Sequence, residues 1–419
     1  MTKPRLDSKA LERYLRFSYP TDGSLFMGGR RASHPKVRFD VVRGRSRKEC
    51  LEELLQILDA MLGAERRCSD AAFLSSGVDS SLIAYGIRAK KTFSVAYEDE
   101  EFDESSLAIQ AAKELGSEHH VIKIGPTEYL GCVDEAMACR SAPTGDASYI
   151  ALFIAAKEAA QYTDVVCSGE GPDELFCGYP CYNRYFEHPV EDFWLSANTI
   201  MDVGEVPELP RYGGDGFLKM NAFDLTIWMQ GNILPNVVAA ARGAGITIRT
   251  PYMRQDLLDF ALSLPPRLKA NESEGKILFR EAAERYVGRK IAYRSKRGFP
   301  VPVRKWMRTA PYAERICDTL TGTLARDVLA GVDVEGILVS YYSSYDDSVW
   351  KQLWEMFVLI RWLNALTNSP VSCSGPSDVC RTAGYFVPTS RHEPESMSAP
   401  DSTVPMNSPR SVGMQRTSA

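Results

Sequence analysis

The stretch Ala71-Ala72-Phe73-Leu74-Ser75-Ser76-Gly77-Val78-Asp79-Ser80-Ser81 decides the fold. An apolar run ends in a small, hydroxyl-rich turn, and residues 82–87 then predict a helix. A strand that stops at such a turn leaves unpaired backbone N–H groups at a helix N-terminus, where phosphate oxygens bind. Asp79 would repel phosphate unless a divalent cation lay between them. The alternative is an ordinary strand-turn-helix connection with small residues in its turn.

A second stretch has the same pattern: Val165-Val166-Cys167-Ser168-Gly169-Glu170-Gly171-Pro172-Asp173-Glu174-Leu175-Phe176-Cys177-Gly178-Tyr179. A short β-branched run leads into a glycine-rich turn that is followed by acidic residues. In a doubly wound parallel sheet, both turns open at the carboxyl ends of their strands, where ligands bind. We therefore expect Asp79 and Asp173 to face one phosphate chain and to share Mg²⁺. The alternative is a solvated acidic loop.

The two turns resemble those of a known family. The first lacks the Gly-Lys-Ser/Thr ending of a P-loop and resembles the Ser-Gly-Gly-x-Asp-Ser loop of ATP pyrophosphatases. The second resembles the Ser-Gly-Glu-Gly-x-Asp-Glu-Leu-Phe-x-Gly-Tyr motif in the synthetase (C-terminal) domain of class B asparagine synthetases and related amide synthetases. Further matches run in the family's order from about Leu6 to about Trp362, including residues 92–95, 249–252, 274–280 and 294–299. The resemblance implies an α/β fold with a doubly wound parallel sheet of the PP-loop, HUP-like type and an α-rich C-terminal part.

The same resemblance implies which residues bind ATP and its pyrophosphate. The candidates for this role are Leu74, Ser75, Ser76, Gly77, Asp79, Ser80, Val95, Ser168, Gly169 and Lys276. Asp79 and Asp173 are the expected Mg²⁺ ligands. Ser76 replaces the first glycine of the family loop, which is compatible with the fold if φ stays negative there. For Lys276, a weaker candidate, packing at the start of a helix is almost as good an explanation.

Glu170 and Lys296 are the two catalytic candidates. An amine that attacks an acyl-adenylate must lose a proton, which a carboxylate beside the α-phosphate can accept. The asparagine-forming members carry Glu at the position of Glu170 and the β-lactam-forming members typically carry Tyr, so Glu170 favours ammonia or a small amine. A structural or helix-capping carboxylate is the alternative. Lys296 matches the family lysine that neutralises pyrophosphate, although a lysine in such a basic cluster is often only a solvated charge.

The part of the chain expected to hold the acid substrate departs from the family pattern. Ser141-Ala142-Pro143 falls where relatives usually carry Asp-Glu-Pro. Apolar residues 237–241 replace acidic and basic positions, and Thr247 stands where Glu usually precedes the Arg249 dipeptide. The ATP half therefore matches the family, while the identity of the acid, aspartate or another, stays open.

Composition limits the class of protein. The chain has 419 residues with a formal net charge of -5, and 44% of them are hydrophobic and 25% charged, as in an ordinary soluble enzyme. No long basic block indicates a nucleic-acid surface, and no apolar run indicates a signal peptide or a membrane span. The 10 cysteines have no metal-ligand spacing and are expected to be reduced thiols of a cytoplasmic protein.

Periodicity divides the chain into segments. We expect a helical segment at 1–65, with helices at residues 10–17 and 48–62, and an ATP-pyrophosphatase domain at 66–368. Its sheet core is expected at about 70–185 and a largely helical part at about 186–368. Residues 369–419 are rich in Ser, Pro and Thr and are expected to be a disordered tail. We expect no glutaminase domain before the matched region, because residue 2 is Thr rather than a nucleophilic Cys.

These features predict an ATP-dependent amide synthetase that forms an acyl-adenylate, releases pyrophosphate and transfers the acyl group to ammonia or an amine. The nitrogen is expected from free ammonia, from a separate glutaminase subunit or from another amine. One alternative is an amide or lactam synthetase of specialised metabolism. The other is a catalytically silent nucleotide-binding subunit that partners a separate glutaminase.

Overall fold

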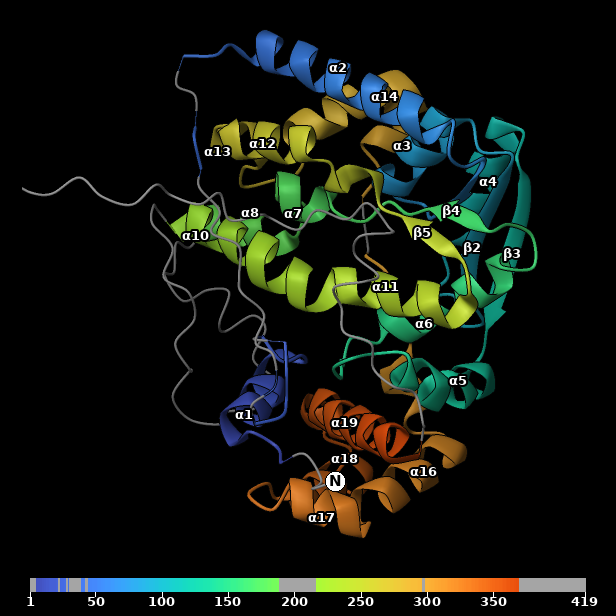
Figure 1. Ribbon diagram of the computed structural model, residues 1–419, viewed down its shortest axis with the longest axis vertical. Coiled ribbons are helices and arrows are strands. Elements are labelled where there is room, and N and C mark those ends of the chain that lie inside the picture. The colour runs from blue at the N-terminus through green and yellow to red at the C-terminus, as the bar shows by residue number, and fades with distance from the viewer. Residues whose placement is uncertain are drawn as a thin grey trace, which may run out of the picture. The chain divides into compact units, whose positions relative to one another are not determined.

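A five-stranded parallel sheet in the order β3-β2-β1-β4-β5 carries the two turns (Figure 1). The computed structural model describes residues 5–21, 23–27, 29, 39–41, 44–187, 216–295 and 298–368, all within the unit Met1–Phe386. The strands are β1 (Ala71–Phe73), β2 (Lys91–Tyr97), β3 (Glu118–Ile124), β4 (Val165–Cys167) and β5 (Thr247–Arg249). Strands β1 and β4 confirm the two strands that were predicted to end in the turns.

The chain reverses direction across the sheet between β1 and β4. From β1 it moves outward to β2 and β3, and it then returns to place β4 and β5 on the other side of β1. In the register, Ala72 pairs with Thr92 on one side and with Cys167 on the other. Ligands of open parallel sheets bind at such a switch point, outside the carboxyl ends of the strands. The two turns identified in the sequence leave the sheet at this point.

Helices cover both faces of the sheet, which makes it doubly wound (Figure 1). Side chains alternate along a strand, so Ala71 and Ala72 face opposite layers. Ala72 and Cys167 pack with α2 (Arg47–Glu65), α3 (Val78–Ile87), α4 (Ser105–Leu115), α12 (Gln255–Ser263) and α14 (Ile277–Ala292). Ala71 and Val166 pack with α5 (Pro126–Ala138), α6 (Ser148–Ala159), α11 (Leu234–Ala244) and α19 (Trp350–Asn368). Burial on both faces explains why the strands read as continuous apolar runs.

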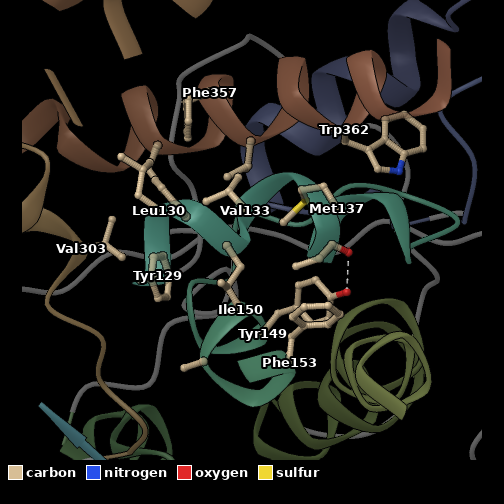
Figure 2. Packing of buried hydrophobic residues seen from close by; sticks show 14 of the residues in the cluster. Tyr129, Leu130, Val133, Met137, Tyr149, Ile150, Phe153, Val303, Phe357 and Trp362 are labelled. Atoms are coloured by element: carbon tan, nitrogen blue, oxygen red, sulfur yellow. Dashed lines mark hydrogen bonds between the residues drawn. The ribbon is translucent and has the colours of Figure 1, made fainter. Parts of the chain in front are cut away.

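In the helix layer that packs on Ala71 and Val166, α5 lies between α6 and α19 (Figure 2). Leu130 and Val133 of α5 are buried against Phe357 of α19. On the other side, the Tyr149 hydroxyl of α6 donates to the Ala136 carbonyl oxygen at 2.6 Å. This buried hydrogen bond satisfies the one polar atom of the Tyr149 side chain.

The remaining elements are mostly short helices. They are α1 (Ser8–Phe17), α7 (Pro172–Phe176), α8 (Pro180–Glu187), α10 (Gly216–Phe223), the π-helix η1 (Asp224–Ile233), the 3₁₀ helix η2 (Pro251–Met253), α13 (Pro266–Lys269), α15 (Val303–Trp306), α16 (Ala310–Leu320), α17 (Thr323–Val328), α18 (Val334–Tyr342) and the 3₁₀ helix η3 (Asp347–Val349). The helices predicted at residues 10–17 and 48–62 are confirmed as α1 and α2. A capping box between Ser46 and Glu49 fixes the start of α2. None of the helices in the described part of the chain is both long and apolar enough to cross a membrane.

Two details differ from the sequence prediction. Strand β5 falls within the segment after Phe186 that was expected to be largely helical, so the sheet extends beyond about residue 185. Thr247–Arg249 is too short to give a periodic signal, and pairing with β4 makes it a strand. Helix α3 begins at Val78 rather than at Leu82, which places Asp79 and Ser80 in its first turn. The predicted tail at 369–419 lies outside the described residues.

Candidate functional site

The first turn connects β1 to α3 and is closed by its own serines. The Ser75 N–H donates to Ser80 Oγ at 2.9 Å, and the two hydroxyl oxygens lie 2.8 Å apart. Gly77 is the N-cap of α3, and no side chain caps this helix. Its first-turn N–H groups therefore face the mouth of the turn without a capping side chain, as an anion site requires. The Ser76 hydroxyl donates to Glu104, and φ of Ser76 is not positive, so the loss of the family glycine is tolerated.

The second turn lies directly on the first. A Cβ atom at Gly169 would be 2.7 Å from the Ser80 backbone nitrogen and 2.8 Å from its Cα. Such distances are far inside van der Waals contact, and the atoms are backbone atoms that cannot rotate away. Gly169 is therefore required because the β4 turn approaches the start of α3 without space for a side chain. The contact brings Ser168, Gly169 and Glu170 beside the β1 turn.

Asp79 and Asp173 converge on one cation, the ammonium group of Lys276. Its Nζ lies 2.8 and 2.7 Å from the two carboxylate oxygens of Asp79 and 2.8 Å from Oδ1 of Asp173. The lysine side chain is 1% exposed, and the aspartates are 10% and 11% exposed. The expectation that the two carboxylates face each other is thus met, with Lys276 between them. Lys276 is also the N-cap of α14 in the left-handed conformation, φ 58°, a conformation that is rare for residues other than glycine.

Two residues close to the turns were not among the site candidates. The Tyr252 hydroxyl donates to the Asp79 carbonyl oxygen at 2.9 Å and is completely buried. Arg294 Nη1 donates to the Ser76 carbonyl oxygen at 3.0 Å and so brings a positive charge to the first turn. Both belong to stretches that match the family, 249–252 and 294–299, which is the signal that could have identified them.

A cavity of about 390 Å³ lies at the switch point. Its lining includes these predicted residues: Leu74, Ser75, Ser76, Gly77, Asp79, Ser80, Val95, Ser168, Gly169, Glu170 and Asp173. Lys276 does not line the cavity and reaches it only through the two aspartates. Lys296 lies outside the described residues, although Gly298, shortly after it, is part of the lining.

The rest of the wall includes Tyr179, the last residue of the second motif, and residues of η1, which no motif indicated. Trp228 and Ile233 of η1 and Tyr179 after α7 line the cavity. Trp228 Nε1 donates to the Tyr179 hydroxyl at 3.2 Å, and this hydroxyl donates in turn to Glu174. Burial, reinforced by the charge of Asp173, raises the pKa of Glu174 to about 8. A π-helix beside a cavity is a recurrent feature of functional sites, but its residues have no distinctive pattern.

The carboxylate pair is chemically suited to magnesium. Within the described ranges, no three His, Cys, Asp or Glu side chains gather as ligands of one metal ion. Mg²⁺, however, commonly binds to one or two carboxylates and takes its other ligands from substrate phosphates and water. Asp79 and Asp173 already share one positive charge beside the uncapped N-terminus of α3. These donors fit a magnesium ion that is bound together with phosphates.

The strand order and the two contacting turns define an α/β protein of the PP-loop ATP-pyrophosphatase type. A model of the asparagine synthase family matches residues 64–364. The chain therefore belongs to the asparagine synthase family, as the resemblance of its motifs implied.

Two relatives illustrate the similarity. A putative glutamine-hydrolyzing asparagine synthetase of Mycobacterium tuberculosis is 25% identical over 372 residues, which are 74% of this chain and 57% of the relative. The glutamine-hydrolyzing asparagine synthetase 1 of Bacillus subtilis is 28% identical over 296 residues, which are 57% of this chain and 47% of the relative. The chain thus spans about half the length of these relatives.

Proposed function

We propose that this chain is an ATP-dependent amide synthetase that activates a carboxylic acid as an acyl-adenylate and passes the acyl group to ammonia or an amine. One observation carries the proposal: two acidic turns at the switch point of a parallel sheet touch each other, and their aspartates share one cation. That arrangement suits a triphosphate cleaved between the α- and β-phosphates better than a P-loop reaction, because no Gly-Lys-Ser/Thr sequence follows the first turn.

In the proposed reaction, the β1 turn binds the departing pyrophosphate. The N–H groups at the start of α3 and the hydroxyls of Ser75 and Ser80 are the donors, and they are fixed before substrate binds. Asp79 and Asp173 would hold Mg²⁺, which when bound neutralises phosphate charge. Lys296 is proposed as a second cation for the pyrophosphate, and Leu74 and Val95 as contacts of the adenine ring.

Glu170 is the proposed general base. It lines the cavity beside the β4 turn and is partly exposed to the cavity. A carboxylate at this place can remove a proton from the attacking ammonia or amine once the adenylate has formed. The names of the relatives suggest glutamine as the ultimate nitrogen source, and we propose a separate glutaminase polypeptide as the supplier of ammonia.

Exchange of labelled pyrophosphate into ATP, dependent on an added acid, tests the proposal. The purified chain should catalyse this exchange with at least one member of a broad panel of carboxylic acids. Asp79→Asn should lower the exchange at least 100-fold, and Glu170→Gln should retain it but lose product formation with ammonia. Absence of exchange with every acid would refute the proposal and favour a catalytically silent nucleotide-binding subunit.

A further inference from the structure

The wall beyond the two turns is apolar. Leu152 of α6, Ile233 of η1 and Val237 of α11 line the cavity there, together with the indole ring of Trp228. These side chains come from elements that carry none of the proposed ATP contacts. Under the proposed function, the turns bind the phosphates and Leu74 and Val95 contact the adenine ring, which leaves this wall to the acyl group.

Polar groups on this wall are already bonded to each other. Asp146 accepts hydrogen bonds from the Ser148 N–H and hydroxyl at 3.0 and 2.6 Å, and from the side-chain amides of Asn232 and Asn236 at 2.7 and 3.0 Å. The amide oxygen of Asn236 accepts from Arg140, a buried residue behind the wall. These hydrogen bonds occupy the Ser148 donors and one N–H of each amide, so these protons reach a substrate carboxylate only if the bonds break.

The polar groups of Trp228 and Tyr179 are also already hydrogen-bonded. The indole N–H is bonded to the tyrosine hydroxyl, whose proton is directed to Glu174. The indole N–H and the phenol proton are therefore already engaged. The aromatic rings of the two lining residues favour apolar or aromatic groups.

Charge disfavours a second carboxylate on the substrate. Among the described residues that line the cavity there is no lysine, arginine or histidine, whereas Glu104, Glu170 and Asp146 are present in addition to Asp79 and Asp173. The ammonium group of Lys276 is held between Asp79 and Asp173. A dicarboxylate bound here would keep one carboxylate without a cationic partner among the described lining residues, which is strongly unfavourable away from water.

We infer that the acid activated by this chain is a monocarboxylic acid with an aliphatic or aromatic body, and not aspartate. The inference rests on the proposed function and specifies its substrate class. The carboxylate lies at the two turns, where it meets the α-phosphate, and the body of the acid lies against Trp228, Ile233 and Val237.

Stable acyl-adenylate mimics test the inference by binding alone. In isothermal titration of the whole chain, phenylacetyl- and hexanoyl-sulfamoyl adenosine should bind at least tenfold more tightly than the β-aspartyl analogue. Tighter binding of the β-aspartyl analogue, or of a lysyl analogue included for its positive charge, would overturn the inference and leave the proposed function intact. Failure of all analogues to bind, together with absence of pyrophosphate exchange, would instead refute the proposed function.

Position 233 offers a matched pair of variants, because Ile233 lines the cavity and is only partly buried. Ile233→Lys supplies the missing cation and should improve the relative affinity of the β-aspartyl analogue at least tenfold. Ile233→Met, of similar size, should keep the preference of the unmodified chain. If Ile233→Lys folds and the preference stays the same, the wall does not contact the acyl group and the inference is wrong. The analogue comparison on the unmodified chain stands even if that variant does not fold.

Discussion

Replacement of Lys276 by Met should destabilise the folded protein strongly. The substitution keeps most of the side-chain volume but removes a charge that lies between two buried carboxylates. Because Nζ lies 2.7 Å from one carboxylate oxygen and 2.8 Å from the other, these oxygens are at most about 5.5 Å apart. At an effective dielectric constant of about 20, two unit negative charges at that separation repel by about 3 kcal/mol. Loss of one partner from buried ion pairs costs about 3–5 kcal/mol, which agrees with this value.

Urea unfolding followed by circular dichroism at pH 7.5 provides the measurement. Lys276→Met should lower the free energy of unfolding by about 3–5 kcal/mol. Lys123→Met is the control, since Lys123 is exposed on β3, and it should change the free energy by less than about 0.5 kcal/mol. The double variant Lys276→Met, Asp173→Asn also removes the repulsion between the two carboxylates, and it should recover about half of the lost free energy of unfolding.

Magnesium provides a second measurement on the same variant. At a concentration ten times its dissociation constant, Mg²⁺ would stabilise the folded state by about 1.4 kcal/mol. The gain should be larger in Lys276→Met than in the unmodified protein, where Mg²⁺ competes with the ammonium group. A loss of stability below about 1 kcal/mol, with no response to Mg²⁺, would show that Lys276 only packs at the start of α14 and that the carboxylates need no cation.

Two further predictions concern the contact between the turns and a buried acid. Gly169→Ala places a Cβ atom 2.7 Å from the Ser80 backbone nitrogen and should lower pyrophosphate exchange at least 100-fold. Gly131→Ala in α5 is the control, because its Cβ atom meets nothing within 4 Å, and it should leave the exchange unchanged. Equal exchange activities of the two variants would contradict the proposed contact between the turns. Burial raises the pKa of Glu355 from its ordinary 4.5 to about 7, so the folded state binds this proton more tightly and loses stability as the pH rises from about 4.5 to 7. Glu355→Gln should therefore gain up to about 3 kcal/mol relative to the unmodified protein between pH 5 and pH 8 in urea unfolding, and a constant difference across that range would be evidence against the shift.

The parts of the fold and site that follow from local patterns could be predicted from the sequence. Strands β1 and β4 are apolar runs that end in glycine-bearing turns, and parallel strands open their carboxyl ends on one side of a sheet. These two facts were sufficient to place Asp79 near Asp173. Strand β5 could not be predicted, because three residues carry no periodicity and pairing with β4 decides their conformation.

The apolar wall could not be predicted for a different reason. A π-helix uses the same residue types as an α-helix, so nothing in residues 224–233 indicates that η1 turns Trp228 and Ile233 toward the cavity. The departures from the family pattern at residues 237–241 did indicate that the acid site is altered. Only the structure specifies the alteration, a wall whose polar groups are bonded to one another.

Lys276 was a candidate site residue, but its place between the two aspartates could not be predicted from the sequence, and backbone strain accompanies it. Lys276 and Cys177 both adopt the left-handed conformation, with φ of 58° and 57°, which costs residues with a side chain roughly 1–2 kcal/mol each. The two segments are in contact, since the Lys276 N–H donates to the Phe176 carbonyl oxygen at 3.1 Å. Cys177 ends the helix that begins beside Asp173, and Lys276 begins α14, so both strained residues lie next to the carboxylate pair. Strain of this kind persists only where surrounding contacts oppose its release, and here those contacts include the two ion pairs of Lys276. The ion pairs of Lys276 therefore stabilise the strained backbone, and this backbone positions the carboxylates. Neither the ion pairs nor the strain can be recognised in a local stretch of sequence.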